Sequence, residues 1–442
     1  MVKYVEAKSF AAYSRTLDVV FFFIYLNMIT IFRPYIEHRE KESYLFSRVV
    51  DEIRGRDSLV WYAVDSCYGQ YLCEETADAF VLLMLQLAMR SGQDLKVEAP
   101  VSARLLFNIE NTLQPLFSKA LPGFRHIKVM AQSVSDQSFH GTAVGCGCSL
   151  GVDSFSSLLK HLSLDVPENY RVTHLTLFNC GQLGDVDLCG AEENLRETLV
   201  QLEPFAKEIH LPLVSINSNL NELYVDSDVR LLQSFVNRTL SCALALQKMF
   251  GKYVYASSYS VENFFMSERD ESHMEAALVP LMGTESTEMI LSNPAMTRVE
   301  KTEYLSRYEI THRYLDVCWA AQMKYGGDRN SILFETKTKK NCGRCLKCMR
   351  TLLTLEILGR IDNFRNIFDI EEYNKRKKWY ICYVAKRKDR DVFSAELVDL
   401  ILSNNYPIPF MAKVLCYEGW GWGLLRAGRR CLLFVKSLFR RK

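Results

Sequence analysis

Two short stretches of the sequence combine residue types that can do chemistry. The first, GCGCSLGVDSFSSLLKHL over residues 145–162, places glycines and serines directly before an apolar helical pattern. Backbone N–H groups in the first turn of a helix lack partners within the helix, and the helix dipole favours negative charge there. Serine hydroxyls add further donors. We therefore expect this turn to bind a phosphate group. The alternative is a helix that is simply N-capped after a strand.

The residues expected to contact the phosphate group follow one another along the chain. They are Ser149, Leu150, Gly151, Val152, Asp153 and Ser154. Asp153 would repel a bare phosphate, so we interpret it as a ligand for the Mg²⁺ that accompanies a nucleotide, or as an acidic residue that favours the helix N-terminus. Two other nucleotide motifs are excluded. A Walker loop requires a lysine directly after its last glycine, and here the first lysine after the glycines is Lys160. The glycine spacing also does not match the G-x-G-x-x-G of dinucleotide-binding loops.

The second stretch is KNCGRCLKCMRT, in which Cys342, Cys345 and Cys348 have the spacing C-x₂-C-x₂-C. Cys318, in LDVCWAA, supplies a fourth thiol. Four thiolates are the ligand count of a closed tetrahedral zinc site, and they leave no open position for water, so we predict a structural Zn²⁺. A four-iron cluster stays open as an alternative, although Leu352 stands where the bacterial ferredoxin pattern has its next cysteine. Chance spacing of buried thiols is the third interpretation.

Composition limits the classes of protein that the chain can belong to. At 442 residues and 48% hydrophobic, it is long enough for two or three packed domains and too apolar for disorder. A net charge of +2 gives no global electrostatic case for nucleic-acid binding. Fourteen cysteines without a recognisable secretion signal favour a reducing, cytoplasmic location. The apolar run from Val19 to Phe32 is too short to span a bilayer, and we expect it to form buried strands.

The elements that position the two stretches alternate between strand and helix from Thr142 onward. We predict strands in TAVGCGCS, VTHLTLFN, AKEIHLPLVSI and YVYASSYS, and helices from Asp153, near Ala191 and from about Leu231. Cys146 and Cys148 alternate on the first of these strands and are expected to be core residues. This alternation favours an α/β fold with a doubly wound parallel sheet, in which ligands bind at the carboxyl ends of the strands.

The first part of the chain has a pattern typical of an α+β domain. Strand-like runs such as SLVWYAV precede the helical stretch TADAFVLLMLQLAMRSG, for which we predict an N-cap at Thr76 and an end at Gly92. The predicted organisation is an N-terminal α+β domain over residues 1–135, a nucleotide-binding domain with the four-cysteine knuckle over 136–365, and a helical, basic C-terminal extension over 366–442.

The motif SLGVDS resembles the S-G-G-x-D-S loop of the N-type ATP pyrophosphatases (the PP-loop superfamily), which grips the pyrophosphate released when ATP adenylates a substrate. Leu150 stands where that family has its first glycine, and a side chain there resists positive φ. A loop of this kind followed late in the domain by a four-cysteine knuckle resembles 7-cyano-7-deazaguanine synthase and its relatives. The resemblance covers roughly residues 140–360. It implies an adenine nucleotide alpha hydrolase-like fold, with ATP, Mg²⁺ and Zn²⁺ as cofactors.

The resemblance also implies a reaction. In that family ATP activates a carboxylate as an acyl-adenylate, and ammonia attacks it to give an amide and then a nitrile. The segments FVNRTLSCALAL (235–246) and RVEKTEYL (298–305) look like segments of the family, which makes Asp153, Arg238 and Lys301 the expected catalytic residues. The two basic side chains would balance phosphate or carboxylate charge. The alternative for both is a solvated surface position.

The substrate is left open by the sequence. The stretch at residues 92–117 looks like the extra N-terminal domain of longer synthase-like proteins met in surface-polysaccharide and phage-defence gene neighbourhoods. What the synthase resemblance implies for this chain is a substrate with a carboxylate that ATP activates, on a small molecule or a modified base. Ammonia would come free or from a partner protein, because Val2 stands where an N-terminal glutaminase needs cysteine. Sulfur transfer to an RNA base by the same activation, and a non-catalytic nucleotide-binding scaffold, are the alternatives.

The end of the chain, WGWGLLRAGRRCLLFVKSLFRRK, combines a helical apolar stripe with basic residues. Seven basic and no acidic residues lie between Arg426 and Lys442. This pattern predicts contact with a membrane surface or an acidic partner, so that the cytoplasmic protein would be peripheral at the membrane. Docking of the stripe on the protein itself is the alternative. A homo-oligomer is compatible with the sequence.

Overall fold

The computed structural model describes residues 28–183, 188–225, 227–318 and 339–416. Contacts divide the chain into two compact units. Unit 1 contains the described residues up to Ser149 together with Ser157–Pro294, and unit 2 contains Leu150–Ser156 and the described residues from Ala295 onward. No helix in these ranges is long and apolar enough to cross a membrane. The predicted membrane contact of residues 420–442 lies outside the described residues.

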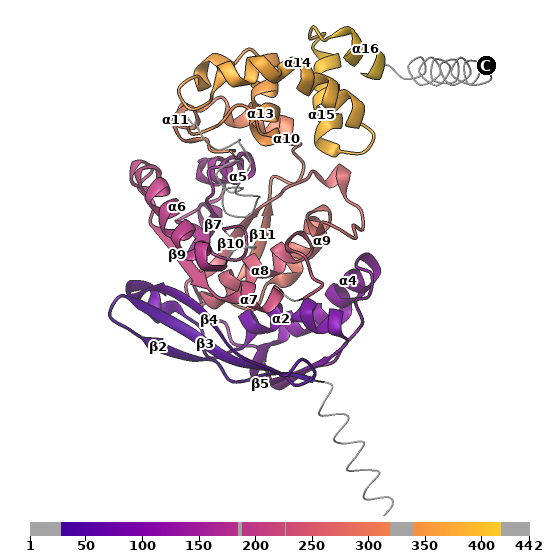
Figure 1. Cartoon of the computed structure of the whole chain (residues 1–442). Helices are drawn as coiled ribbons and strands as arrows, with labels where there is room; N and C mark the ends of the chain where they lie inside the picture. The colour runs from indigo at the N-terminus through magenta and orange to yellow at the C-terminus, as the bar shows by residue number, and fades with distance from the viewer. Residues whose placement is uncertain (1–27, 184–187, 226, 319–338, 417–442) are drawn as a thin grey trace, which may run out of the picture. The chain divides into compact units, whose positions relative to one another are not determined.

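The strands of unit 1 form one eleven-stranded, mixed and mostly parallel sheet in the order β11-β10-β7-β8-β9-β4-β3-β1-β5-β6, with β2 paired to β3 (Figure 1). This confirms the predicted α/β class. The strands are β1 (Met28–Ile31), β2 (Tyr35–His38), β3 (Glu42–Asp51), β4 (Arg56–Asp65), β5 (Asp94–Ser102), β6 (Val129–Ser135), β7 (Ala143–Gly147), β8 (His174–Phe178), β9 (Leu213–Ser218), β10 (Phe250–Ala256) and β11 (Glu288–Ser292).

Five neighbouring strands, β11-β10-β7-β8-β9, are parallel to one another. β7 comes first in the chain and lies in the middle, with β8 and β9 on one side and β10 and β11 on the other. This is the strand order of doubly wound sheets. The chain runs outward from β7 through β8 to β9, returns to the other side of β7, and continues outward through β10 to β11. The three central residues of β7 and four of the five residues of β8 are buried, as in parallel strands covered on both faces. Cys146 and Cys148 are buried, as predicted.

Four helices, α2, α5, α6 and α8, lie where the sequence predicts them. Gly92 ends α2 in the left-handed conformation, as predicted, but the N-cap is Ala77 and not Thr76. The Thr76 hydroxyl instead donates to Asp78 Oδ2 at 2.7 Å, because the buried Asp78 needs partners inside the core. The described helices before residue 295 are α2 (Asp78–Ser91), α3 (Ala103–Asn108), α4 (Gln114–Ala120), α5 (Val152–Leu162), α6 (Leu188–Glu208), α7 (Leu220–Tyr224), α8 (Leu231–Ala245) and α9 (Glu275–Leu278).

The N-terminal strands continue the sheet of the parallel strands through β4 and β9. These two strands pair antiparallel at Tyr62↔Ser218 and Ala63↔Asn217. The side chain of Asn219 extends the pairing, because it accepts from the N–H of Trp61 and donates to the carbonyl of Leu59, each at 2.9 Å. α2 packs against α8, and one cluster of buried apolar side chains includes residues of the N-terminal strands and of the parallel strands. The N-terminal strands and the parallel strands therefore belong to the same compact unit, and the predicted domain boundaries near 135 and 365 stay a prediction.

Unit 2 is built from helices, and its described part contains no strand. α13 packs against α10, α14 and α15, and α14 also contacts α16. α10 begins with a capping box, in which the Thr297 hydroxyl accepts from the N–H of Glu300 and the Glu300 carboxylate accepts from the N–H of Thr297. The helices after residue 295 are α10 (Arg298–Leu305), α11 (Thr311–Tyr314), α13 (Leu346–Ile357), α14 (Ile370–Arg387), α15 (Val392–Ser403) and α16 (Phe410–Cys416).

Candidate functional site

The predicted phosphate loop connects the end of β7 to the start of α5. Leu150 has a φ of 54°, so its backbone is in the left-handed region that glycine adopts without strain. Its side chain is buried, with 1% of its surface exposed, and its carbonyl accepts a hydrogen bond from the N–H of Asp316 at 2.8 Å. The loop is therefore anchored at its most strained residue. Helical hydrogen bonding begins with the N–H of Phe155 and the carbonyl of Gly151 at 2.9 Å.

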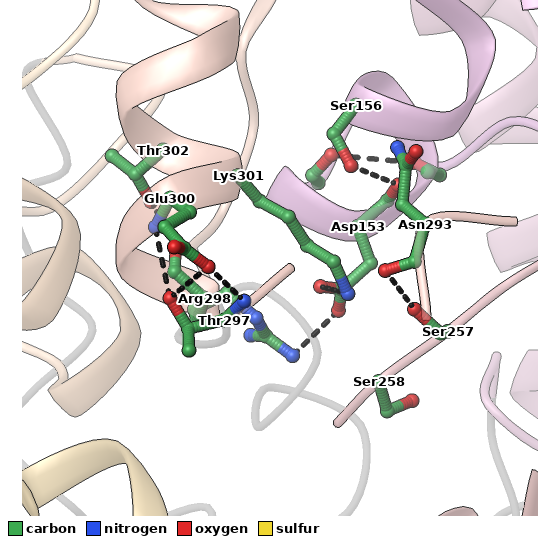
Figure 2. A network of polar contacts seen from close by, with 12 residues as sticks. Asp153, Ser156, Ser257, Ser258, Asn293, Thr297, Arg298, Glu300, Lys301 and Thr302 are labelled. Carbon is green, nitrogen blue, oxygen red and sulfur yellow. Dashed lines mark hydrogen bonds and ion pairs between the residues drawn. The ribbon is translucent and has the colours of Figure 1, made fainter. Parts of the chain in front are cut away.

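Asp153 lies in the first turn of α5, where two cations from α10 meet its carboxylate. Figure 2 shows the side chains of Arg298 and Lys301 directed toward it. An Nη of Arg298 lies 2.6 Å from Oδ2 of Asp153, and Nζ of Lys301 lies 3.6 Å from Oδ1. The two basic residues are three positions apart on one helix and so share a face. The structure thus brings together Asp153 and Lys301, two of the three predicted catalytic residues.

Burial makes these charges strongly interacting. The Lys301 side chain is fully buried, and that of Arg298 is 13% exposed. Oδ1 of Asp153 is also buried and accepts no hydrogen bond from the described residues. A buried carboxylate oxygen of this kind has the capacity to bind a further donor or a metal ion, because burial without a hydrogen bond costs free energy.

A third cation and a second carboxyl lie near Arg298. The guanidinium groups of Arg298 and Arg350 both lie over the ring of Phe393, 4.7 and 4.0 Å from its centroid. Burial, followed by the charge of Arg298, lowers the pKa of Arg350 from its usual value. Glu396 accepts from the N–H of Arg298 at 2.9 Å, and burial raises the pKa of this carboxyl. Positive charge is therefore in excess around Asp153, as an anion site requires.

Arg238, the third predicted catalytic residue, belongs to unit 1 and has a different environment. It is 1% exposed on α8, where its Nε donates to the hydroxyl of Ser234 at 2.9 Å and an Nη donates to Asn221 Oδ1 at 3.1 Å. Its guanidinium lies 3.7 Å from the centroid of the Tyr224 ring. These contacts hold α7 and α8 together. A contact of Arg238 with substrate stays a prediction.

The four predicted metal ligands come together in unit 2. The sulfur atoms of Cys318, Cys342, Cys345 and Cys348 all lie within 4.8 Å of one another, and those of Cys342 and Cys348 are 3.9 Å apart. Sulfur atoms bound to zinc at about 2.3 Å in a tetrahedron are about 3.8 Å apart, so the group can hold a metal such as zinc. Hydrogen bonds from the neighbouring thiols, first that of Cys318, lower the pKa of Cys342 well below its usual range.

The backbone around the thiols is shaped for this cluster. The N–H of Cys345 donates to the sulfur of Cys342 at 3.4 Å. Gly343 between them has a φ of 65°, and a Cβ there would lie 2.0 Å from the carbonyl oxygen of Asp369. Glycine is therefore required at this turn on two grounds, since other residues avoid positive φ and would also collide.

Asn341, which sequence reasoning missed, joins the two segments that carry the cysteines. Its side chain is fully buried; Oδ1 accepts from the N–H of Val317, and Nδ2 donates to the carbonyl of Leu315, each at 2.9 Å. Its backbone exchanges hydrogen bonds with Ile367 and Asp369. Asn341 thus holds Cys318 beside the C-x₂-C-x₂-C segment. Nothing in the local sequence marks this role, because the contacts join residues 24 or more positions apart.

Arg298 was also missed as a site residue, although the sequence carried a signal for it. It is the first residue of the same helix as Lys301 and lies one turn away on the same face. No family model, no curated protein and no solved structure matches the chain. The candidate site therefore depends on its own residues and their geometry.

Proposed function

We propose that this protein is an ATP-dependent enzyme that activates a carboxylate by adenylation with release of pyrophosphate, after which ammonia or another nucleophile attacks the activated carbonyl. The observation that carries this proposal is Asp153, whose buried Oδ1 accepts no hydrogen bond from the described residues while two cations of α10 flank the carboxylate. Excess positive charge at a helix N-terminus is the chemistry that recognises a polyphosphate.

Each residue of this cluster has a role in the proposed reaction. Arg298 and Lys301 would neutralise the charge that develops on the leaving pyrophosphate, and the N–H groups at the start of α5 would orient its oxygens. Asp153 fits Mg²⁺, because this ion is commonly held by one or two carboxylates together with substrate phosphates. When bound, the ion would screen the triphosphate and lower the barrier to attack at the α-phosphorus.

The proposed chemistry balances in two steps. A carboxylate oxygen of the substrate attacks the α-phosphorus of ATP, and the bond from that phosphorus to the bridging oxygen breaks, so that the oxygen leaves on pyrophosphate. Ammonia then attacks the carbonyl carbon of the acyl-adenylate. The carbon–oxygen bond to AMP breaks, AMP leaves with the electron pair, and loss of a proton from nitrogen gives the amide.

The thiol cluster supports a structural part for zinc in this proposal. With four thiolates bound, zinc has no open position for water, so it would hold the chain rather than act on substrate. Cys345 and Cys348 flank the start of α13, the helix that carries Arg350. Zinc would thereby fix the helix that contributes to the positive charge near Asp153.

One observation favours a second candidate, a non-catalytic nucleotide-binding scaffold. Arg298 and Lys301 both form ion pairs with Asp153, so the charge of this carboxylate is balanced without a ligand. A scaffold of this kind would bind ATP without exchanging its pyrophosphate.

The test is ATP–pyrophosphate exchange with the purified full chain, Mg²⁺ and a panel of carboxylic acids. We expect exchange with at least one acid, and a loss of kcat/KM of about 100-fold or more in Lys301→Met and Asp153→Asn. Lys301→Met keeps the shape of the buried side chain. Arg307→Gln is the matched control, since this arginine forms an exposed ion pair with Glu303 just beyond α10.

Binding of ATP by calorimetry separates the candidates. ATP binding without exchange across the whole panel would favour the scaffold. Exchange at an unchanged rate in Lys301→Met would contradict the assignment of the site, and failure of the chain to bind Mg-ATP would contradict both candidates.

A further inference from the structure

The outward side of α14 carries a ladder of stacked side chains. Trp379, Tyr383 and Arg387 are spaced four residues apart and so lie one above the next along the helix. The Trp379 and Tyr383 rings stack with centroids 5.3 Å apart and an interplanar angle of 30°. The Arg387 guanidinium lies 5.3 Å from the Tyr383 centroid. Trp379 is 58% exposed, which is unusual for so large an apolar ring. We call these three residues the α14 ladder.

Positive charge surrounds the α14 ladder. The segment from Glu371 to Arg390 contains eight basic and three acidic residues, a net charge of +5 in a chain whose total is only +2. Several of the basic residues are paired: Lys375 and Arg376 with Glu372, and Lys377 with Glu356. Within the described parts of the chain, no ion pair forms at four cations. These are Lys378, Lys386, Arg387 and Arg390.

The helix that presents the α14 ladder is held firmly from its other side. Tyr373, Tyr380, Ile381 and Val384 are buried. The Tyr373 hydroxyl donates to Glu356 at 2.5 Å. The aromatic rings are therefore presented on a fixed backbone, and binding to them would require little ordering of the protein.

The exposed residues of α14 decide between two kinds of anionic partner. Among them Trp379 alone is apolar, and the others are charged or amide side chains. A helix that lies in a membrane surface needs a broad apolar face to insert, and α14 lacks one. Aromatic rings interleaved with cations instead match a strand of phosphates whose unpaired bases can stack. A duplex keeps its bases stacked inside and offers the rings nothing.

We propose that the α14 ladder binds single-stranded nucleic acid. The bases stack on Trp379 and beside Tyr383, while Lys378, Lys386, Arg387 and Arg390 contact the phosphates. This binding site does not depend on the proposed adenylation, and it requires neither ATP nor Mg²⁺. The two proposals can therefore fail separately.

The experiment measures fluorescence anisotropy of a labelled oligouridylate of about 20 nucleotides, long enough for several stacked bases, with the full chain at salt concentrations from about 50 to 200 mM. We expect Trp379→Ala to raise Kd about tenfold or more at every salt concentration, and Trp379→Phe to keep Kd within about threefold, because phenylalanine still stacks. Tyr35→Ala, which removes an exposed aromatic ring from β2, is the matched control and should leave Kd unchanged.

The cations give a second, independent readout. For single strands the logarithm of the binding constant falls with the logarithm of salt concentration by about 0.7 for each phosphate neutralised. Lys386→Gln/Arg387→Gln should therefore reduce the slope by about 1.4, whereas Trp379→Ala should leave the slope unchanged. Far-UV circular dichroism of each variant checks that α14 still forms.

Four results would overturn the proposal. They are no binding of the oligonucleotide at the lowest salt concentration, equal affinity of the native chain and Trp379→Ala, tighter binding of a duplex of the same length, and binding only to vesicles of phosphatidylglycerol and phosphatidylcholine.

Discussion

Replacing Leu150 tests the loop before α5 directly, because two opposing effects meet at this residue. Its φ of 54° places a branched side chain in the left-handed region, which costs about 1–2 kcal/mol. Its side chain is 1% exposed, and cutting such a leucine to alanine costs about 2–5 kcal/mol. Burial is the larger effect. This explains how the loop keeps its conformation without a glycine at this position.

The comparison of Leu150→Ala with Leu150→Gly isolates the strain. Both variants lose the buried side chain, and both should lower the free energy of unfolding by about 2–5 kcal/mol. Only glycine removes the left-handed strain, which stabilises this variant by about 1–2 kcal/mol. Glycine also increases the entropy of the unfolded chain, which destabilises the same variant by about 0.4–1 kcal/mol. The glycine variant should therefore be more stable than the alanine variant by about 1 kcal/mol.

The assay is guanidinium denaturation followed by far-UV circular dichroism, with the two units fitted as separate transitions. At a position with ordinary negative φ the order is reversed, and alanine is the more stable by about 0.5–1 kcal/mol. An alanine variant that unfolds at higher denaturant concentration than the glycine variant would therefore refute the left-handed backbone at residue 150 and the loop geometry built on it.

Three further predictions concern the thiol cluster and a buried acid. Cys345→Ser should lose most of its bound zinc by elemental analysis, while Cys67→Ser, at an exposed cysteine outside the cluster, should keep it; full metal in both would contradict the ligand set. Asn341→Ala should weaken zinc binding about 10- to 100-fold in competition with a chelator, and unchanged affinity would show that Asn341 does not position Cys318. Burial raises the pKa of Glu271, so its folded state holds a proton that the unfolded chain releases above a pKa of about 4.3. The stability that this neutral carboxyl contributes is present at low pH and is lost as the pH rises toward the folded pKa. The free energy of unfolding, measured by urea denaturation, should therefore fall less between about pH 5 and 8 in Glu271→Gln than in the native chain. Parallel declines in the two proteins would exclude this acid as the cause.

The local elements were predictable from sequence because their signals are local. The start of α8 at Leu231 and the end of α2 at Gly92 follow from apolar periodicity and from the left-handed conformation of glycine. The N-cap of α2 was predicted at the wrong residue, since the partner that takes the Thr76 hydroxyl is the buried Asp78 rather than a backbone N–H. A threonine just before a helix can cap the helix or donate to a buried carboxylate, and the local sequence is the same in both cases.

The candidate site was predictable only in part, for a related reason. The spacing of the cysteines indicates that they bind one metal ion, so their convergence could be predicted. Asn341 acts across 24 or more positions of sequence, and its hydrogen bonds exist only once both segments have folded. The pairing of β4 with β9 is of the same kind, because no pattern within either strand names its partner.

The pairing of β4 with β9 has a consequence for any shortened form of the protein. If the chain began after residue 135, β9 would lose the neighbour that covers its outer hydrogen-bonding groups and would become the border of the sheet. Unpaired strand borders recruit other chains and promote aggregation. The N-terminal strands therefore protect this border from self-association, and expression of the chain from residue 136 onward should yield insoluble material.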